Sequence, residues 1–123
     1  MFQYEAMVMR IVDGDTIWLD VDLGFKVRMQ VDVRLAHIDT PELVNYGLKG
    51  VSSPAIEYVN QCVPPGAVCV VNIIRAEKYG RWLAEIYYKP GSVDRDEILR
   101  SGTNLNDELV KKGFAKAYEG GKK

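Results

Sequence analysis

The stretch FKVRMQVDVRL, residues 25–35, places apolar side chains at every odd position and polar side chains at every even position. This alternation is typical of a β-strand with one buried face, because successive side chains of a strand point to opposite sides. Residues 17–21 alternate in the same way, and Gly24 lies between the two runs. Together they predict a long antiparallel hairpin.

The segments around this hairpin predict three further strands. Residues 7–12 are expected to lead into the hairpin as a strand, and the apolar residues 68–74 and 82–88 to form two later strands. Residues 89–102 hold Pro90, Gly91, Ser92 and several charges, so an exposed loop or an irregular hairpin is expected there.

Two helices are also expected. Residues 54–62 follow Ser53, which suits an N-cap, and begin with Pro54, which is favoured at the first helical position. Residues 106–113 carry acids in the first turn, lysines in the last turn and a closing Gly113. These charges complement a helix dipole and the glycine ends the helix, so a second, short helix is predicted.

Three strands, a helix, two strands and a helix predict an α+β or all-β fold. The order suits a five-stranded Greek-key barrel of the OB type, with a helix between strands 3 and 4 and a short C-terminal helix. Another α+β meander has the same periodicity and stays open as an alternative. The length of 123 residues suits one domain, expected over residues 1–119, with a mobile tail over residues 120–123.

The charge balance is close to neutral. Sixteen basic and seventeen acidic residues give a formal net charge of −1. The chain therefore lacks the large positive net charge of proteins that coat DNA. No apolar run approaches the roughly 20 residues of a transmembrane helix, and the first residues show no secretory signal. We therefore expect a cytoplasmic monomer in which Cys62 and Cys69 stay reduced.

The first of three segments suited to catalysis is VDGDT, residues 12–16. An Asp-Gly pair between two strands is typical of a hairpin turn. The carboxylate of Asp15 lies two residues after that of Asp13, and such a pair can share a hard cation. Asp13 has two alternatives, contact with the metal through water or a hydrogen bond within its own turn.

The second segment is RLAHIDTPE, residues 34–42. Strict alternation from Arg34 would expose Ile38 and bury Asp39, at a cost of several kcal/mol for the unpaired carboxylate. A single β-bulge at residues 36–37 would bring Ile38 inside and place Asp39 beside Arg34. The alternative is a strand end followed by a Thr-Pro turn with acids on the surface.

The third segment is EKYGRWLA, residues 77–84, which alone is typical of a surface hairpin. Combined with the first two segments, it suggests a site for a phosphate and a metal. Asp15 and Asp39 suit calcium or magnesium, which bind oxygen ligands. The guanidinium groups of Arg34 and Arg81 suit a phosphate, and Glu42 can orient or deprotonate water.

The pattern Val-Asp-Gly-Asp-Thr, then Val-Arg-Leu-x-x-Ile-Asp-Thr-Pro-Glu, then Lys-Tyr-Gly-Arg-x-Leu-Ala resembles the staphylococcal nuclease-like (thermonuclease) family. Residues 106–116 resemble the last conserved stretch of that family, so the resemblance covers nearly the whole chain. It implies an OB barrel, a bound calcium ion, and cleavage of DNA or RNA that leaves 3′-phosphate ends. The sequence departs from the pattern in three places: it stops soon after Tyr118, and the hairpin before Arg34 and the loop at residues 89–102 are longer.

The resemblance also implies roles for nine residues. The metal ligands are Asp15 and Asp39 through their carboxylates and Thr40 through its backbone carbonyl. The catalytic residues are Arg34 and Arg81, which bind phosphate, and Glu42, the candidate general base. The residues that contact nucleotide are Lys78, Tyr79 and Tyr118. We therefore expect a calcium-dependent nuclease; the alternative is a catalytically weak nucleic-acid- or peptide-binding OB module of the same family.

Overall fold

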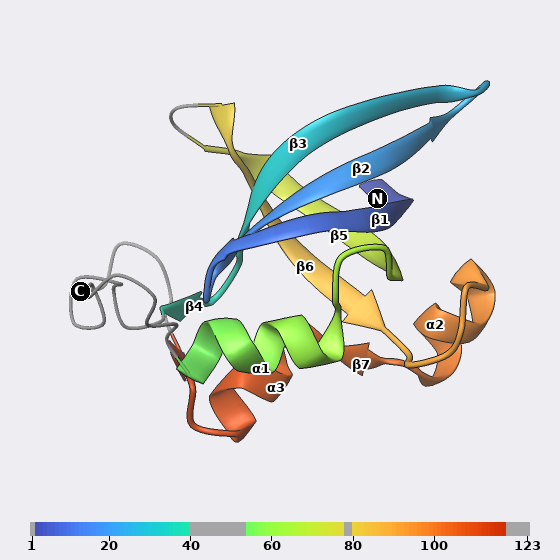
Figure 1. Ribbon diagram of the computed structural model, residues 1–123. Helices are drawn as coiled ribbons and strands as arrows, with labels where there is room; N and C mark the ends of the chain where they lie inside the picture. The colour runs from blue at the N-terminus through green and yellow to red at the C-terminus, as the bar shows by residue number, and fades with distance from the viewer. Residues whose placement is uncertain (1, 40–53, 78–79, 118–123) are drawn as a thin grey trace.

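A computed structural model describes residues 2–39, 54–77 and 80–117 of the chain (Figure 1). Its centre is a sheet of five long strands that closes on itself. The strands are β1 (Phe2–Asp13), β2 (Thr16–Gly24), β3 (Val27–Leu35), β5 (Val68–Ala76) and β6 (Trp82–Tyr88). They follow the order β3-β2-β1-β5-β6, and a parallel β3–β6 pairing closes the barrel. The expected five-stranded OB-type barrel is thus confirmed.

Strands β2 and β3 form the long antiparallel hairpin that the sequence pattern predicts. Its register runs from Thr16 opposite Arg34 to Gly24 opposite Val27, so the turn consists of Phe25 and Lys26. Both turn residues have positive φ, 55° and 65°. This left-handed conformation costs a residue with a Cβ about 1–2 kcal/mol, which is why glycine or asparagine is usual in such turns.

The helices gather mainly at one side of the barrel (Figure 1). Helix α1 (Pro54–Cys62) and helix α3 (Leu105–Lys111) lie where the sequence predicts helices, and they contact each other. Tyr58 of α1 stacks on Phe114 with ring centroids 4.8 Å apart, and its hydroxyl donates to Glu108 Oε2 at 3.0 Å. No helix in the described part of the chain is long and apolar enough to cross a membrane.

The prediction for residues 89–102 was wrong in its second half. Residues 95–101 form helix α2 (Arg95–Ser101), because the side chain of Asp94 caps its N-terminus by accepting from Asp96 N at 3.0 Å. The chain then continues through β7 (Thr103–Asn104), which pairs with β6. The short strands β4 (Ile38–Asp39) and β8 (Lys116–Ala117) form a separate antiparallel pair.

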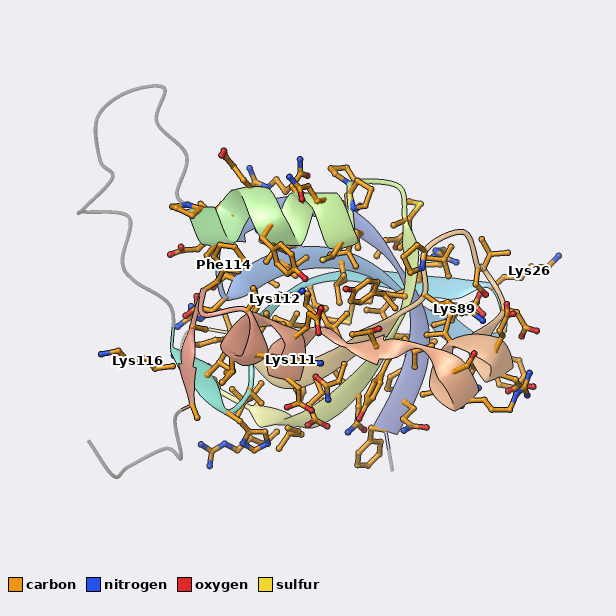
Figure 2. The ribbon with its side chains drawn as sticks, turned by 90° about the horizontal axis from the view of Figure 1, so that it is seen from below. Lys26, Lys89, Lys111, Lys112, Phe114 and Lys116 are labelled. Carbon is orange, nitrogen blue, oxygen red and sulfur yellow. The ribbon has the colours of Figure 1, made fainter. Side chains whose placement is uncertain are left out.

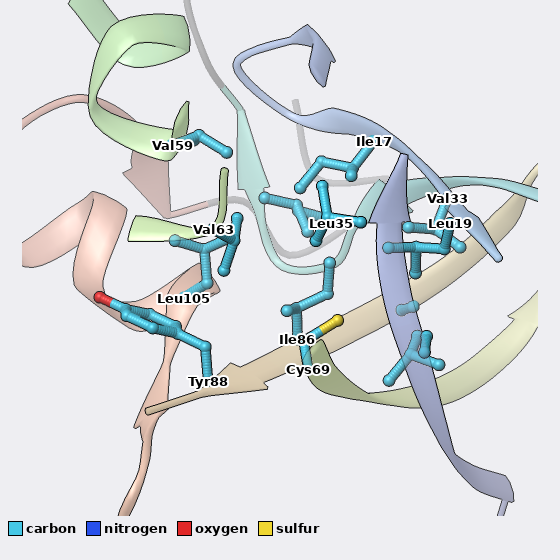
Figure 3. Packing of buried hydrophobic residues seen from close by; sticks show 14 of the residues in the cluster. Ile17, Leu19, Val33, Leu35, Val59, Val63, Cys69, Ile86, Tyr88 and Leu105 are labelled. Atoms are coloured by element: carbon cyan, nitrogen blue, oxygen red, sulfur yellow. The ribbon is translucent and has the colours of Figure 1, made fainter. Parts of the chain in front are cut away.

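The core is built from the inward side chains of the strands and from one face each of α1 and α3 (Figure 3). The odd positions 17, 19 and 21 of β2 and 33 and 35 of β3 are buried as the alternation predicts, whereas Leu23, Val27 and Met29 near the hairpin tip are exposed. Fully buried members are Ile17, Leu19, Val33, Leu35, Val59, Val63, Ile86 and Leu105. At roughly 1.5–3 kcal/mol per large aliphatic side chain, this burial is the main stabilising contribution.

The two thiols are unpaired, and they differ in environment. Cys69 is fully buried, and burial raises the pKa of its thiol from 9.0 to about 12, whereas Cys62 is half-buried. Only the thiolate reacts quickly with alkylating reagents. We therefore expect iodoacetamide at mildly alkaline pH to modify Cys62 in the folded protein and Cys69 only after unfolding, as peptide mass spectrometry would measure. Equal labelling rates would contradict the packing around Cys69.

Candidate active site

The β1–β2 turn positions Asp15 beside the end of β3. The turn consists of Gly14 and Asp15, because Asp13 and Thr16 are directly paired across it. Asp13 Oδ1 accepts from Gly14 N at 2.7 Å, so this carboxylate does bond its own turn. The carbonyl of Asp15 accepts from Leu35 N at 2.8 Å, which fixes the turn against β3.

Arg34 comes to Asp15 from β3, where it lies directly opposite Thr16. Its Nη2 is 3.8 Å from Asp15 Oδ2, and the two side chains are only 19% and 13% exposed. Thr16 Oγ1 donates to Asp15 Oδ1 at 3.2 Å. A carboxylate and a guanidinium therefore meet in a largely buried position, where an ion pair is screened less by salt than on the surface.

Arg81 directly precedes β6, which pairs with the strand that carries Arg34. Residues Ala84 and Ile86 of β6 belong to the core, so the alternation of strand side chains puts Leu83 on the opposite face, and the same alternation continued by one residue predicts that face for Arg81. Arg34 is paired with Leu83 in the parallel β3–β6 register and shares that face. The backbone carbonyl of Arg81 accepts from Glu77 N at 2.8 Å, which holds the residue at the start of β6.

The chain after Arg34 turns instead of forming the single β-bulge that the sequence predicts. Strand β3 ends at Leu35, residues 36 and 37 form a turn in which His37 has φ 66°, and β4 begins at Ile38. Ile38 is 1% exposed, so its predicted burial is confirmed, but a turn and not a β-bulge brings it inside. The backbone of Asp39 lies in β4, opposite Lys116 of β8.

Asn106 is a residue that the sequence did not single out for a role at the site. It is 1% exposed at the start of α3, and its side chain makes three hydrogen bonds to backbone groups of the barrel. Its Nδ2 donates to Ala36 O at 2.8 Å and Ala84 O at 3.1 Å, and its Oδ1 accepts from Ile86 N at 3.2 Å. Asn106 thus ties α3 both to β6 and to the turn that follows Arg34.

The other sequence-predicted site residues lie outside the described residues: Thr40, Glu42, Lys78, Tyr79 and Tyr118, together with the side chain of Asp39. Within the described ranges, no group of three or more His, Cys, Asp or Glu side chains is placed to hold a metal ion. The structure therefore brings Asp15 and Arg34 together, and the functional roles of all nine residues stay predictions.

Comparison with known proteins decides the family. The model of the staphylococcal nuclease homologue (SNase) family matches residues 32–123. The chain belongs to the staphylococcal nuclease family. Endonuclease YhcR of Bacillus subtilis is similar to this SNase domain, with 31% identity over 94% of the chain. An uncharacterized endonuclease of Escherichia coli O157:H7 is 28% identical over 91% of the chain. The SNase domain spans only 9% and 60% of these two relatives.

Solved structures show the same fold at low sequence identity. The extended Tudor domain of Drosophila melanogaster Papi aligns with a TM-score of 0.64 at 9% identity, covering 95% of the SNase chain and 100% of its own. The extended Tudor domain from BmPAPI, solved in complex with sDMA, aligns with a TM-score of 0.63 at 8% identity and the same coverage. At these identities the likeness concerns the fold alone.

Proposed function

We propose that this SNase domain is a calcium-dependent nuclease that hydrolyses phosphodiester bonds in DNA or RNA and leaves 3′-phosphate ends. The observation that carries the proposal is the meeting of Asp15 with Arg34 on the face that Arg81 shares. Family membership and the endonuclease names of similar proteins support the reaction class. The product ends and the calcium requirement rest on the family resemblance.

The two arginines are assigned to the phosphate. Each guanidinium offers a planar fork of donors that matches two phosphoryl oxygens, and both lie on one face of the β3–β6 pair. Negative charge grows on those oxygens as water attacks phosphorus in line, so donors fixed in advance lower the barrier most at that point. Glu42 is assigned to orient the water or to accept its proton.

Asp15 fits a calcium ligand by its chemistry. Its distance of 3.8 Å to Arg34 Nη2 is longer than a hydrogen bond, so its Oδ2 is not engaged in a close bidentate pair. Asp39 and the carbonyl of Thr40 are assigned as the other protein ligands, and calcium accepts such a mixture of oxygens in flexible geometry. Bound calcium would supply positive charge that polarises a phosphoryl oxygen.

Lys78, Tyr79 and Tyr118 are assigned to contact nucleotide, on the resemblance alone. The alternative function is a nucleic-acid- or peptide-binding OB module without effective catalysis. The near-neutral net charge of −1 is compatible with that alternative, but both described arginines and Asp15 of the catalytic pattern are present. Plasmid cleavage therefore separates the two functions, because only the nuclease converts supercoiled DNA to nicked or linear forms.

The metal requirement can be tested with calcium, magnesium and a chelator in parallel. We expect calcium to support plasmid cleavage far better than magnesium, because a loop-borne carboxylate and carbonyl site suits calcium's flexible coordination better than magnesium's rigid octahedron. Chelator should abolish cleavage. Calcium should also raise the melting temperature of the protein, since a ligand that binds only the folded state stabilises it.

Asp15→Asn tests the assigned ligand, and Asp22→Asn is its matched control. Asp22 is a strand carboxylate near Arg28 at the far end of β2, where the charge change should leave calcium stabilisation unaltered. We expect Asp15→Asn to lose both cleavage and the calcium-induced rise in melting temperature. Equal rates in calcium and magnesium at saturation would overturn the calcium assignment, and cleavage by none of the metals would favour the binding module.

A further inference from the structure

The outer face of the β1–β2–β3 meander carries Arg34 and continues beyond it. Ile17, Leu19 and Val33 belong to the core, so the residues between them along β2 and β3 lie on the outer face. The described helices contact mainly β1, β5 and β6, and the two strands of the hairpin run away from them (Figure 1). These helices thus leave the outer face of the hairpin largely uncovered.

Trp18 lies on this face next to the proposed phosphate site. It pairs with Asp32 of β3, and Thr16, two residues earlier, pairs with Arg34, so Trp18 and Arg34 are diagonal neighbours. Diagonal neighbours on one face of a sheet lie about 7–8 Å apart, which is within reach of aromatic and long side chains. A nucleic-acid strand whose phosphate is bound by Arg34 can therefore place an adjacent base over Trp18.

A β-bulge brings Arg10 to the other side of Trp18. Val8 of β1 is fully buried, and strict alternation would send Arg10 into the core as well. The β1–β2 register shifts between Val8 and Arg10, so that Arg10 pairs with Trp18 and Ile11 pairs with Ile17. Arg10 is consequently exposed on the outer face, directly opposite Trp18. Bulges that re-aim a side chain in this way are common next to active sites.

Neither Trp18 nor Arg10 is engaged in a strong side-chain contact within the described residues. The ring stacking of the described chain joins two other aromatic residues and does not involve the half-buried indole of Trp18. The salt bridges of the described chain use Arg28, Arg34 and Lys89 as their cations, and Arg10 takes part in none of them. A ring and a cation placed side by side on an outer face suit a ligand that carries both an aromatic ring and negative charge.

Asp32 sets the direction in which such a ligand can lie. Its half-buried carboxylate is opposite Trp18 on the β3 side, so Trp18 has a cation beside it on β1 and an anion beside it on β3. A phosphate is attracted by Arg10 and repelled by Asp32. The phosphate next to a base stacked on Trp18 is therefore expected on the β1 side.

We propose that Arg10 and Trp18 form a nucleotide subsite adjoining the active site, in which one unpaired base stacks on Trp18 and a neighbouring phosphate binds Arg10. Arg34, Trp18 and Arg10 then cross the three strands as cation, aromatic ring and cation, and this order matches phosphate, base and phosphate along a single strand. The subsite rests on the proposed function in one respect, the assignment of Arg34 to a phosphate.

Tryptophan fluorescence reports the stacking directly and needs no cleavage. Trp82→Phe leaves Trp18 as the only indole of the chain, and a base stacked on an indole quenches its emission. We expect a single-stranded oligothymidylate of about eight nucleotides, added with chelator so that it stays intact, to quench this variant. In Trp18→Phe the remaining indole lies on the core-facing side of β6, and its emission should not change.

The anisotropy of a labelled copy of this oligonucleotide measures what each residue contributes to affinity. Trp18→Ala should raise the dissociation constant roughly 10–100-fold, because a stacked base loses its aromatic partner, whereas Trp18→Phe keeps a ring and should retain most of the affinity. Arg10→Ala should reduce the steepness of log affinity against log salt by about 0.7, since one phosphate contact to a single strand is lost. In calcium-supported cleavage, Trp18→Ala should raise KM and leave kcat near the wild-type value.

Phe25→Ala and Arg95→Ala are the matched controls, and neither should change the dissociation constant. Phe25 is a fully exposed aromatic residue at the hairpin tip. Its neighbour Lys26 lies at the opposite end of the molecule from Lys116, which pairs with Asp39 (Figure 2). Arg95 is an exposed arginine of α2. If circular dichroism shows Trp18→Ala to be unfolded, Trp18→Leu replaces it, because leucine keeps an apolar side chain without a ring.

The outcomes separate the subsite from the nuclease assignment. Trp18 emission that stays unquenched while the anisotropy saturates would overturn the subsite, and so would an unchanged dissociation constant in the ring-less variant; cleavage by the wild type would leave the nuclease assignment standing. A wild-type chain that binds no oligonucleotide would overturn both. Quenching of Trp18 in a chain that cuts no plasmid would support the subsite and count against the nuclease alone.

Discussion

Arg81→Lys is expected to reduce the rate of phosphodiester cleavage on the order of 100–1,000-fold, about 3–4 kcal/mol in the barrier. The substitution keeps the positive charge but removes the planar fork of donors. If Arg81 grips a phosphoryl oxygen, that loss is felt mainly in the transition state, where the charge on the oxygen is largest. The measurement is single-turnover cleavage of a labelled oligonucleotide with saturating calcium.

Stability should not change in this variant. Arg81 is half-buried directly before β6, and its backbone carbonyl accepts a hydrogen bond from Glu77 N that lysine can keep. Substitutions of this kind usually alter the free energy of unfolding by no more than about 0.5 kcal/mol. Arg95→Lys, an exposed arginine of α2, is the control and should cleave at the wild-type rate. If Arg81→Lys cleaved at the wild-type rate, Arg81 would not bind the phosphate in the transition state, and we would abandon the proposed mechanism.

Asn106→Ala is expected to lower the free energy of unfolding by about 2–5 kcal/mol. The substitution leaves the N–H of Ile86 and the C=O of Ala36 without their side-chain partner in the protein interior. A buried backbone group that loses its partner costs about 1–3 kcal/mol. Ala84 O is affected less, because it also accepts from Ala36 N at 2.8 Å. Urea unfolding followed by circular dichroism measures the loss.

Asn60→Ala is the matched control, since Asn60 is exposed on α1 and the substitution favours the helix. It should change the free energy of unfolding by no more than about 0.5 kcal/mol. If Asn106→Ala were as stable as this control, the three hydrogen bonds of Asn106 would contribute little and α3 would be held by packing alone.

The barrel could be predicted because its strands carry a periodic signal along their whole length. The alternation over residues 17–35 identifies the buried face, and the observed burial of Ile17, Val33 and Leu35 follows it. Helix α2 was missed because Pro90 and Gly91 suggest an irregular segment. The cap that begins the helix, Asp94, comes only after them.

The site could be predicted only as residue types. Asp15 directly precedes β2, and Arg34 lies on β3 opposite Thr16, so their meeting follows from the hairpin register. The turn at residues 36–37 could not be distinguished from a bulge, because both devices bury Ile38. Asn106 gave no signal, since its three partners are backbone atoms from distant strands and no side-chain pattern encodes them.

The short parallel seam between β3 and β6 has a consequence for the order of folding. Asp15 and Arg34 belong to a meander of consecutive strands, which forms with little loss of chain entropy. The seam instead joins Val33 to Trp82, two segments far apart in the chain, through only three residue pairs. Contacts of such long range are slow to form, because the chain must first lose the conformational entropy of the long loop that they close. Arg81 thus comes near the other two residues only when the barrel closes, so under the proposed assignment we expect cleavage activity to report completed closure.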